Sequence, residues 1–316
     1  MNAFKSISWL EGLKAGIRTA WMLGKVVFPV TLVVTVLQYT AVYEALISLI
    51  EPAMGWFGLP GEAAVPLVLG NLLNTYAAVA AILTMELSVK QVFILAVMIN
   101  FSHMLPVESA VCRRIGASAT LVTLVRLTLA LAAGLVLNLV WSGGGQPAEF
   151  AVAATGDSAP SGWVGILGDG LQSAASGLLQ LALIVIPVMM FIQILKDLKV
   201  LDWFAARMRP LMRPLGLPDR GSVTMASGLL FGLAFGAGVI MEQAREQKFS
   251  RRELTLIVLF LSACHAIIED TLVFVPLGVD VLPLVAIRVT VAVALTLAIA
   301  LLWKPEPDTT PAPSRR

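Results

Sequence analysis

Long apolar runs alternate with short polar segments along this chain. Six runs approach the roughly 20 residues that a membrane-spanning helix requires, and they lie at 20–38, 91–112, 118–141, 177–195, 253–275 and 283–303. Two further apolar segments, 63–84 and 221–242, carry glycine or asparagine near their centres. These residues favour a re-entrant hairpin of two half-helices, with an ordinary, closely packed span as the alternative. We expect an all-α polytopic membrane protein with about six full spans and two re-entrant hairpins.

The two halves of the chain repeat each other in sequence. Residues 13–82 align with a segment 158 positions later, so that the Gly-Leu-Pro motif at 58–60 recurs at 216–218. After residue 88 the offset becomes 162, and the two histidines of the chain then coincide, His103 with His265. The same offset pairs other polar residues, namely Glu108 with Asp270 and Arg126 with Arg288. A polar set that recurs at one register predicts one site built from two copies of a unit.

Positive charge is distributed unequally between equivalent segments. Segment 39–62 contains no lysine or arginine but three glutamates, whereas its repeat mate 196–220 contains six basic residues. Because lysine and arginine collect in cytoplasmic loops, the two segments should face opposite sides of the membrane. The expected structural repeat is therefore inverted, and each half crosses the membrane an odd number of times. The charge pattern also places both termini in the cytoplasm.

The same pattern divides the chain into four parts. Residues 1–142 are expected to form the first repeat with an amphipathic lead-in, 143–170 a flexible extracytoplasmic linker, 171–303 the second repeat, and 304–316 a disordered cytoplasmic tail. Short interfacial helices are expected at 43–57 and 201–215, each followed by the Gly-Leu-Pro motif.

Composition excludes several classes of protein. Of 316 residues, 58% are hydrophobic and only 13% are charged, whereas soluble domains carry about 25% charged residues. The net charge of +2 gives no reason to expect nucleic acid as a partner. The chain has no phosphate-binding loop and no hydrolase or metalloprotease motif, so we do not expect an enzyme. Cys112 and Cys264 do not occupy equivalent positions and are expected to be buried thiols.

Polar and ionisable side chains at membrane depth mark the candidate site, because such residues are costly in a bilayer and usually functional. Pro106 is expected to break the helix that carries His103 and to expose backbone carbonyls to a ligand. The candidate substrate-binding residues are His103, Glu108, His265, Glu269, Asp270, Asn100, Ser262, Asn71, Asn74, Arg126 and Arg288.

Each candidate also has a structural interpretation. One histidine alone would favour a packing role, and the matching pair shifts the balance towards a shared site. The two arginines either neutralise nearby carboxylates as buried ion pairs or bind an anionic substrate through the planar guanidinium. The two asparagines of segment 63–84 either cap half-helices or bind a ligand, and capping is the favoured interpretation.

A metal site is a further hypothesis. Imidazole and carboxylate ligands suit zinc, iron or manganese, and the candidate ligands are His103, His265, Glu108, Asp270 and Cys264. No short ligand motif is present, so the site would have to be assembled across the interface between the halves. The alternatives for a bound cation are a coupling proton or sodium ion and a transported divalent metal.

Two stretches of the second half resemble a known family. The glycine-rich segment 228–232 and the stretch Ser-Ala-Cys-His-Ala-Ile-Ile-Glu-Asp-Thr at 262–271 are similar to the nucleoside-recognition "Gate" family. That family includes the membrane part of Feo-type ferrous-iron transporters and spore-maturation membrane proteins, and it is distantly similar to concentrative nucleoside transporters. The resemblance implies an inverted-repeat membrane fold with re-entrant elements and a transport-related role. This chain lacks the GTP-binding domain of the iron transporters.

We therefore expect a secondary transporter or permease that moves a small polar solute across a bacterial inner membrane through a site between the two halves. A permease for divalent transition metals such as iron or zinc is the second hypothesis. A non-transporting membrane scaffold or assembly factor is the third. The expected partners are the lipid bilayer and a small-molecule or ion substrate, and a homo-oligomer is a further hypothesis.

Overall fold

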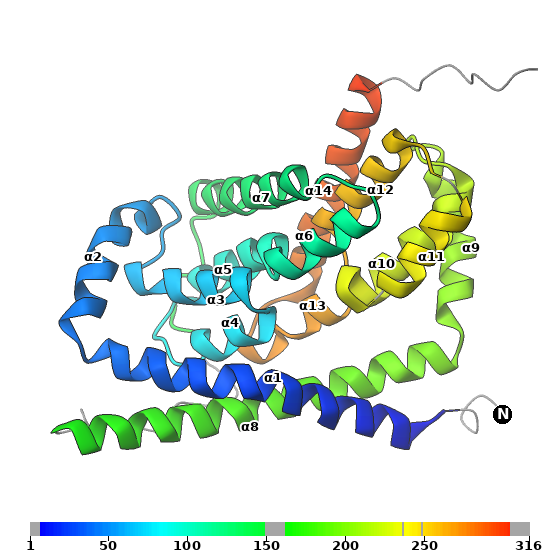
Figure 1. The fold of residues 1–316 in the computed structure, drawn as a ribbon. Helices are drawn as coiled ribbons and strands as arrows, with labels where there is room; N and C mark the ends of the chain where they lie inside the picture. The colour runs from blue at the N-terminus through cyan, green and yellow to red at the C-terminus, as the bar shows by residue number, and fades with distance from the viewer. Residues whose placement is uncertain (1–6, 149–161, 236, 248, 304–316) are drawn as a thin grey trace, which may run out of the picture.

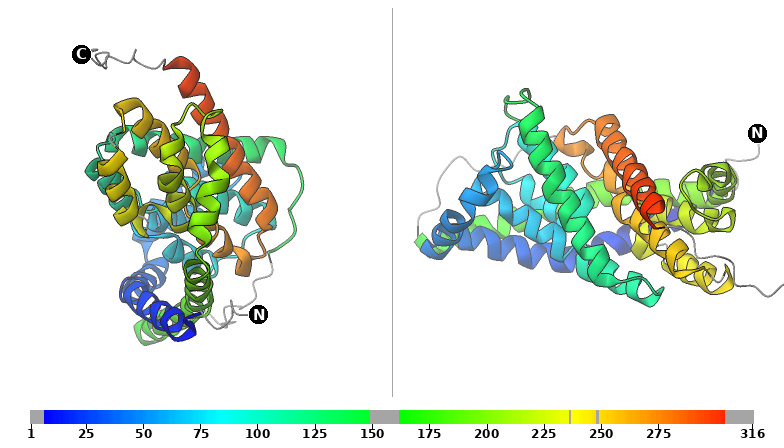
Figure 2. Two further views of the ribbon diagram at one scale, coloured as in Figure 1. Left: turned by 90° about the vertical axis from the view of Figure 1, so that its right-hand side faces the viewer. Right: turned by 90° about the horizontal axis from the view of Figure 1, so that it is seen from above.

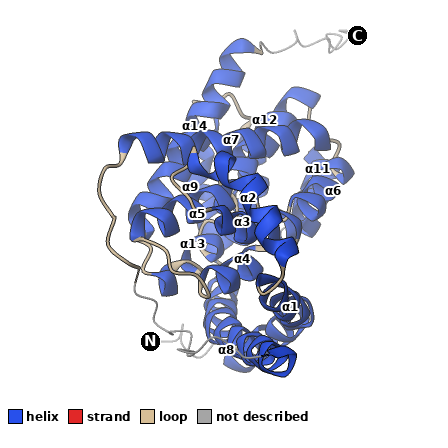
Figure 3. Ribbon diagram, turned by 90° about the vertical axis from the view of Figure 1, so that its left-hand side faces the viewer, coloured by secondary structure: helices blue, strands red, loops and turns tan. Residues whose placement is uncertain are grey.

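The computed structural model describes residues 7–148, 162–235, 237–247 and 249–303. This part of the chain forms helices and no named strand (Figure 3). The helices are α1 (Trp9–Gln38), α2 (Ala41–Gly55), η2 (Gly61–Ala63), α3 (Ala64–Leu72), α4 (Thr75–Ile82), α5 (Val89–Ser102), α6 (Leu105–Arg114), α7 (Ala119–Val140), α8 (Gly162–Asp197), α9 (Val200–Met212), η3 (Asp219–Gly221), α10 (Ser222–Phe235), α11 (Ala237–Gln247), α12 (Arg251–Ala263), α13 (Glu269–Leu272), η4 (Val275–Leu277) and α14 (Val281–Leu302). The all-α prediction is confirmed.

Four helical segments of the described residues are long and apolar enough to cross a membrane: Val89–Arg114, Ala119–Val140, Gly162–Asp197 and Val281–Leu302. They correspond, to within a few residues, to four of the six expected spans, namely 91–112, 118–141, 177–195 and 283–303. The expected span 20–38 forms the later part of α1. The expected span 253–275 was wrong as one helix, because α12 ends at Ala263 and the chain continues through the short helices α13 and η4.

Helices α1 and α8 lie side by side and antiparallel along their length (Figures 1 and 2). The backbone N–H of Ser8, before α1, donates to Asp197 at the end of α8, at 2.7 Å. At the opposite end Tyr39 donates its hydroxyl to Asp169, at 2.9 Å. A Cβ added at Gly16 would lie 2.9 Å from the Cα of Ile186, so glycine permits this close approach. The equivalent helices of the two halves therefore run in opposite directions.

The two segments expected as hairpins are each interrupted near the middle. Leu73 and Asn74 separate α3 from α4, and Asn74 has extended backbone and caps α4. At the equivalent place in the second half, Gly232 takes φ 78° within α10, a conformation that favours glycine. The interruptions thus fall at the same offset of 158. Their depth in a membrane, and hence their re-entrant character, stays a prediction.

The helices that carry the histidines are broken as well. Helix α5 ends at Ser102, and Met104 takes a left-handed conformation before α6 begins. The break follows the sequence-based expectation for Pro106, which lies in the first turn of α6. The second half has the same break without a proline, since Ala266 takes φ 42° between α12 and α13.

Matching backbone hydrogen bonds hold each broken helix against the interrupted segment of its own half. The N–H of Met104 donates to the carbonyl of Gly70 at 2.9 Å, and that of Ala266 donates to Gly228 at 3.0 Å. Because these donors and acceptors occupy equivalent positions, the two breaks are products of one repeated arrangement.

The core lies around α5 and α12, whose residues 92–102 and 256–263 are buried. Helix α7 contacts both α5 and α12, and α14 contacts both α12 and α5, so the two halves interlock. The bounds of α7 and α14 recur at the offset of 162, and those of η2 and η3 recur at 158. Helices α2 and α9 overlap the segments 43–57 and 201–215 that were expected to form short helices, and each begins and ends earlier than expected.

The ends of the expected parts differ in detail from the structure. Helix α1 begins at Trp9, so the described part of the lead-in and the first span form one helix. Helix α8 begins at Gly162, inside the expected linker 143–170. Gly144, which lies earlier in that linker, accepts a hydrogen bond from the backbone N–H of Lys90 at 2.8 Å. The tail 304–316 lies outside the described residues.

Candidate functional site

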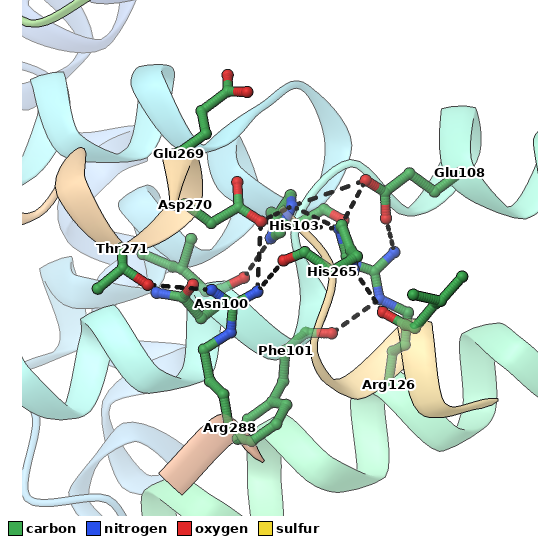
Figure 4. A network of polar contacts seen from close by, with 12 residues as sticks. Asn100, Phe101, His103, Glu108, Arg126, His265, Glu269, Asp270, Thr271 and Arg288 are labelled. Carbon is green, nitrogen blue, oxygen red and sulfur yellow. Dashed lines mark hydrogen bonds and ion pairs between the residues drawn. The ribbon is translucent and has the colours of Figure 1, made fainter. Parts of the chain in front are cut away.

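The two broken helices bring His103 and His265 next to each other, with their ring centroids 5.0 Å apart (Figure 4). Each histidine follows the buried end of a long helix, α5 or α12. Their Nε2 atoms lie 3.2 Å apart, and the side chains are only 2% and 1% exposed. The structure therefore joins the two histidines that the sequence repeat paired.

Each imidazole is oriented by the helix that it ends. The Nδ1 atom of His103 lies 2.9 Å from the carbonyl oxygen of Ile99, four residues earlier. The Nδ1 atom of His265 lies 2.7 Å from the carbonyl oxygen of Leu261, at the same spacing. A carbonyl oxygen only accepts hydrogen bonds, so each Nδ1 carries a proton. In the neutral ring, the lone pair is then on Nε2, which faces the other half.

Two carboxylates complete the cluster. Glu108 Oε1 lies 3.0 Å from the Nε2 atom of His265 and 3.7 Å from that of His103. Asp270 Oδ2 lies 3.4 Å from the Nε2 atom of His103 and 3.8 Å from that of His265. Each half thus contributes one imidazole and one carboxylate to a single cluster.

Two fully buried arginines support the cluster from opposite sides (Figure 4). Arg126 forms an ion pair with Glu108 and donates to two carbonyls that the break of α5 leaves free, those of Phe101 at 2.8 Å and His103 at 2.7 Å. Arg288 pairs with Asp270 and donates to the carbonyl of His265. The arginines thus satisfy the broken helix ends and offset the buried carboxylate charges.

A cavity of about 100 Å³ adjoins the cluster and is lined by residues of both halves. Its lining residues are Thr19, Asn74, Thr75, Tyr76, His103, Met104, Glu108, Phe231, Gly232, Leu233, His265, Ala266, Glu269 and Asp270. Tyr76 of the first half donates its hydroxyl to Glu269 of the second half at 2.8 Å, and both side chains are buried. Both interrupted segments and both broken helices therefore border one cavity.

Five of the remaining candidates lie outside the cavity lining, namely Asn71, Asn100, Ser262, Arg126 and Arg288. Asn100 and Ser262 donate hydrogen bonds to carbonyls of their own helices, at 2.8 Å and 2.6 Å. Asn71 is half-buried at the end of α3, whereas Asn74 lines the cavity and accepts from the N–H of Ala77, which agrees with its expected role as a cap. Both arginines face the carboxylates and not the cavity.

Sequence reasoning missed several lining residues. Tyr76 stands two residues after Asn74 in an otherwise apolar segment, and this lone phenol is a signal that could have identified it. Thr75 follows Asn74 directly and is a further polar residue in that apolar segment, so it could have been identified in the same way. Thr19 comes from α1, and its position in the sequence carries no comparable indication.

One group of side chains could hold a metal ion. Donor atoms of His103, His265 and Asp270 all lie within 4.8 Å of one another, and all three residues are buried. Glu108 is close to both imidazoles, and its other oxygen is bound by Arg126. Cys264 is a buried free thiol, and it is not a member of this group.

Comparisons with known proteins agree with this architecture. The Gate family, described as "Nucleoside recognition", matches residues 20–139 and 178–278, which include both histidines. The chain is 52% identical over 296 residues to "Uncharacterized membrane protein YvoD" of Bacillus subtilis (strain 168), and the match covers 94% of this chain and 95% of that protein. No solved structure matches the chain. The chain belongs to the Gate family of membrane proteins.

Proposed function

We propose that this protein is a secondary transporter that moves a small polar solute across the bacterial inner membrane through the cavity between its two halves. The observation that carries the proposal is the cavity between the two halves, which is lined at equivalent positions by the histidines and carboxylates of both halves. Ionisable groups are costly inside an apolar protein and usually mark a substrate or ion pathway. We infer that these groups bind the transported substrate or a coupling ion.

An inverted repeat supports alternating access from the two sides of the membrane. The antiparallel contact of α1 with α8 is what such a repeat requires. Figure 1 also shows α2 and α9 at opposite ends of this helix pair. Since the segment around α9 is basic and the segment around α2 is acidic, the charge bias favours cytoplasmic placement of α9 and of both termini.

The interrupted segments supply the movable parts of the proposed pathway. Asn74 and Gly232 mark their interruptions, and both residues line the cavity. Non-helical backbone at membrane depth is tolerated where it borders protein or water. We infer that these segments are re-entrant hairpins and that a rearrangement at the interruptions opens the cavity to one side at a time.

The charge of the cavity favours a substrate with hydrogen-bond donors or positive charge. Glu108, Glu269 and Asp270 line the cavity, and its described lining includes no lysine or arginine. A coupling proton or sodium ion would bind to the same groups. A divalent-metal permease is the second candidate, favoured by the close grouping of two imidazoles with a carboxylate.

Solute uptake into proteoliposomes tests the proposal. The probes are a radiolabelled nucleoside, an amino acid and a polyamine, together with zinc detected by a trapped dye. We expect saturable uptake of at least one probe, which the His103→Ala/His265→Ala variant abolishes. Thr255→Ala is the matched control, because Thr255 lies on α12 and only bonds the carbonyl of Arg251. Uptake of every probe at the level of protein-free vesicles would contradict transport and favour a scaffold.

A further inference from the structure

Three donor atoms converge where the two halves meet. They are the Nε2 atoms of His103 and His265 and the Oδ2 atom of Asp270, and the three distances between them are 3.2, 3.4 and 3.8 Å. His103 directly follows α5, His265 lies between α12 and α13, and Asp270 lies in α13, so the two halves of the sequence both contribute. All three residues are buried, and all three border the cavity.

The orientation of the two imidazoles favours a positive charge between them, either a bound metal ion or a proton on one Nε2. Their Nδ1 protons are used by the carbonyls of Ile99 and Leu261, so the two neutral rings direct lone pairs at each other across 3.2 Å. Carboxylate oxygens lie close to both lone pairs as well. Four electron-rich atoms with no positive charge among them would repel one another. A bound cation turns this repulsion into attraction.

The net charge of the cluster points the same way. Arg126 offsets the charge of Glu108. Arg288 offsets the charge of Asp270. Among the described residues Glu269 forms no ion pair with an arginine, and it accepts a hydrogen bond from Tyr76. With all three carboxylates ionised, the two arginines leave one negative charge in the buried group, which Lys196 and a bound cation would offset.

The distances suit a transition metal. Zinc binds histidine nitrogen and carboxylate oxygen at about 2.0–2.2 Å, which places neighbouring ligands of a tetrahedral ion about 3.3 Å apart. The observed separations of 3.2, 3.4 and 3.8 Å bracket this value, so a small inward shift would complete the coordination. Calcium and magnesium prefer ligand sets made of oxygen atoms, whereas imidazole with carboxylate suits zinc, iron and manganese.

We propose that His103, His265 and Asp270 bind one divalent transition-metal ion of the zinc class, with the fourth coordination position open to the cavity. Three protein ligands leave an exchangeable position, whereas structural zinc sites use four. The carbonyls of Ile99 and Leu261 fix the imidazoles from behind, as supporting groups do in metal sites. Glu108 approaches from the side opposite Asp270 and adds negative potential (Figure 4).

The metal site deepens the proposed function, and it can be tested without transport. The purified protein, stripped with a chelator in detergent, is titrated with zinc in a calorimeter. We expect one zinc ion per chain. His103→Ala and Asp270→Asn should each weaken zinc binding at least about tenfold, the low end of the effect of disturbing a metal site. Cys264→Ala should keep the wild-type affinity, because Cys264 lies outside the ligand group.

The two experiments distinguish a protein that does not bind zinc from a protein that does not transport a solute. Absence of zinc binding to the folded wild-type protein would overturn the site whatever the variants do. Equal binding by His103→Ala and by wild type, or loss of binding in Cys264→Ala, would overturn the ligand assignment. Uptake of an organic probe by vesicles free of zinc, together with no zinc binding, would leave the transporter standing and reject the metal. Melting temperatures in detergent verify that each variant is folded.

Discussion

At the scale of single residues, Arg126 and Arg288 are the most tightly constrained side chains of the site. Each is fully buried and bonds both a carboxylate and the carbonyl of the histidine in its own half. A planar guanidinium with several donors can satisfy such a set at once, whereas lysine cannot reproduce its geometry. The arginines therefore connect the break in each helix to the position of the ionisable cluster.

Replacement of Arg126 by methionine should destabilise the protein strongly. The change leaves Glu108 as a buried charge without its partner, which typically costs about 3–5 kcal/mol. Thermal and denaturant unfolding in detergent measure the effect. The Arg126→Met/Glu108→Leu double variant should recover part of the loss, because it removes both charges together. A single variant as stable as wild type would show that the ion pair does not hold the site.

The sequence identified the histidines and carboxylates because they recur at one offset. It did not decide whether the arginines pair with carboxylates or bind an anionic substrate, because that depends on their distance in space from Glu108 and Asp270. Asn100 and Ser262 lie near the histidines along their helices but bond their own backbone carbonyls. Spacing along the helix does not predict these hydrogen-bond partners. It also does not predict the contact between Tyr76 and Glu269, which joins the two halves.

At the scale of helices, the α1/α8 pair depends on glycine at its contact surface. A Cβ at Gly16 would lie 2.9 Å from the backbone of Ile186, whereas a Cβ at Gly168 of α8 would meet nothing within 4 Å. The two positions therefore form a matched pair of sites, one in the contact and one away from it, within helices of similar character.

Gly16→Val should lower the melting temperature relative to Gly168→Val. Both variants replace a helical glycine with valine, so the change in helix propensity is the same. Only Gly16→Val forces α1 away from α8, and such overpacking typically destabilises a protein by about 1–3 kcal/mol. Melting curves in one detergent compare the two variants with wild type. Equal melting temperatures for the two variants would contradict the close packing of these helices.

Helix boundaries were predictable where a local signal exists. The Gly-Leu-Pro motifs mark the ends of α2 and α9, and Gly58 and Gly216 take φ of 67° and 71° after those helices. Pro106 pointed to the break after α5. The equivalent break after α12 has no proline, and the hydrogen bond from Ala266 to Gly228 accompanies it. An interaction between distant segments of that kind cannot be read from an apolar run, so 253–275 was expected as one span.

At the scale of the whole molecule, the repeat explains why one site contains two similar halves. The equivalent helices α1 and α8 run antiparallel, and α7 and α14 each contact the central helices of both halves. The two copies therefore cannot work as separate domains. Their contact places the histidines together, and any movement of one half against the other changes the cluster and the cavity beside it.

The central claim is that the two repeats have opposite orientations in the membrane, and labelling of equivalent positions tests it most directly. Glu51 in α2 and Arg209 in α9 are both exposed and are related by the offset of 158, while the native cysteines are buried. In intact cells, a membrane-impermeant maleimide should label Glu51→Cys, and it should label Arg209→Cys only after the cells are opened. Labelling of both positions from the same side would contradict the inverted repeat.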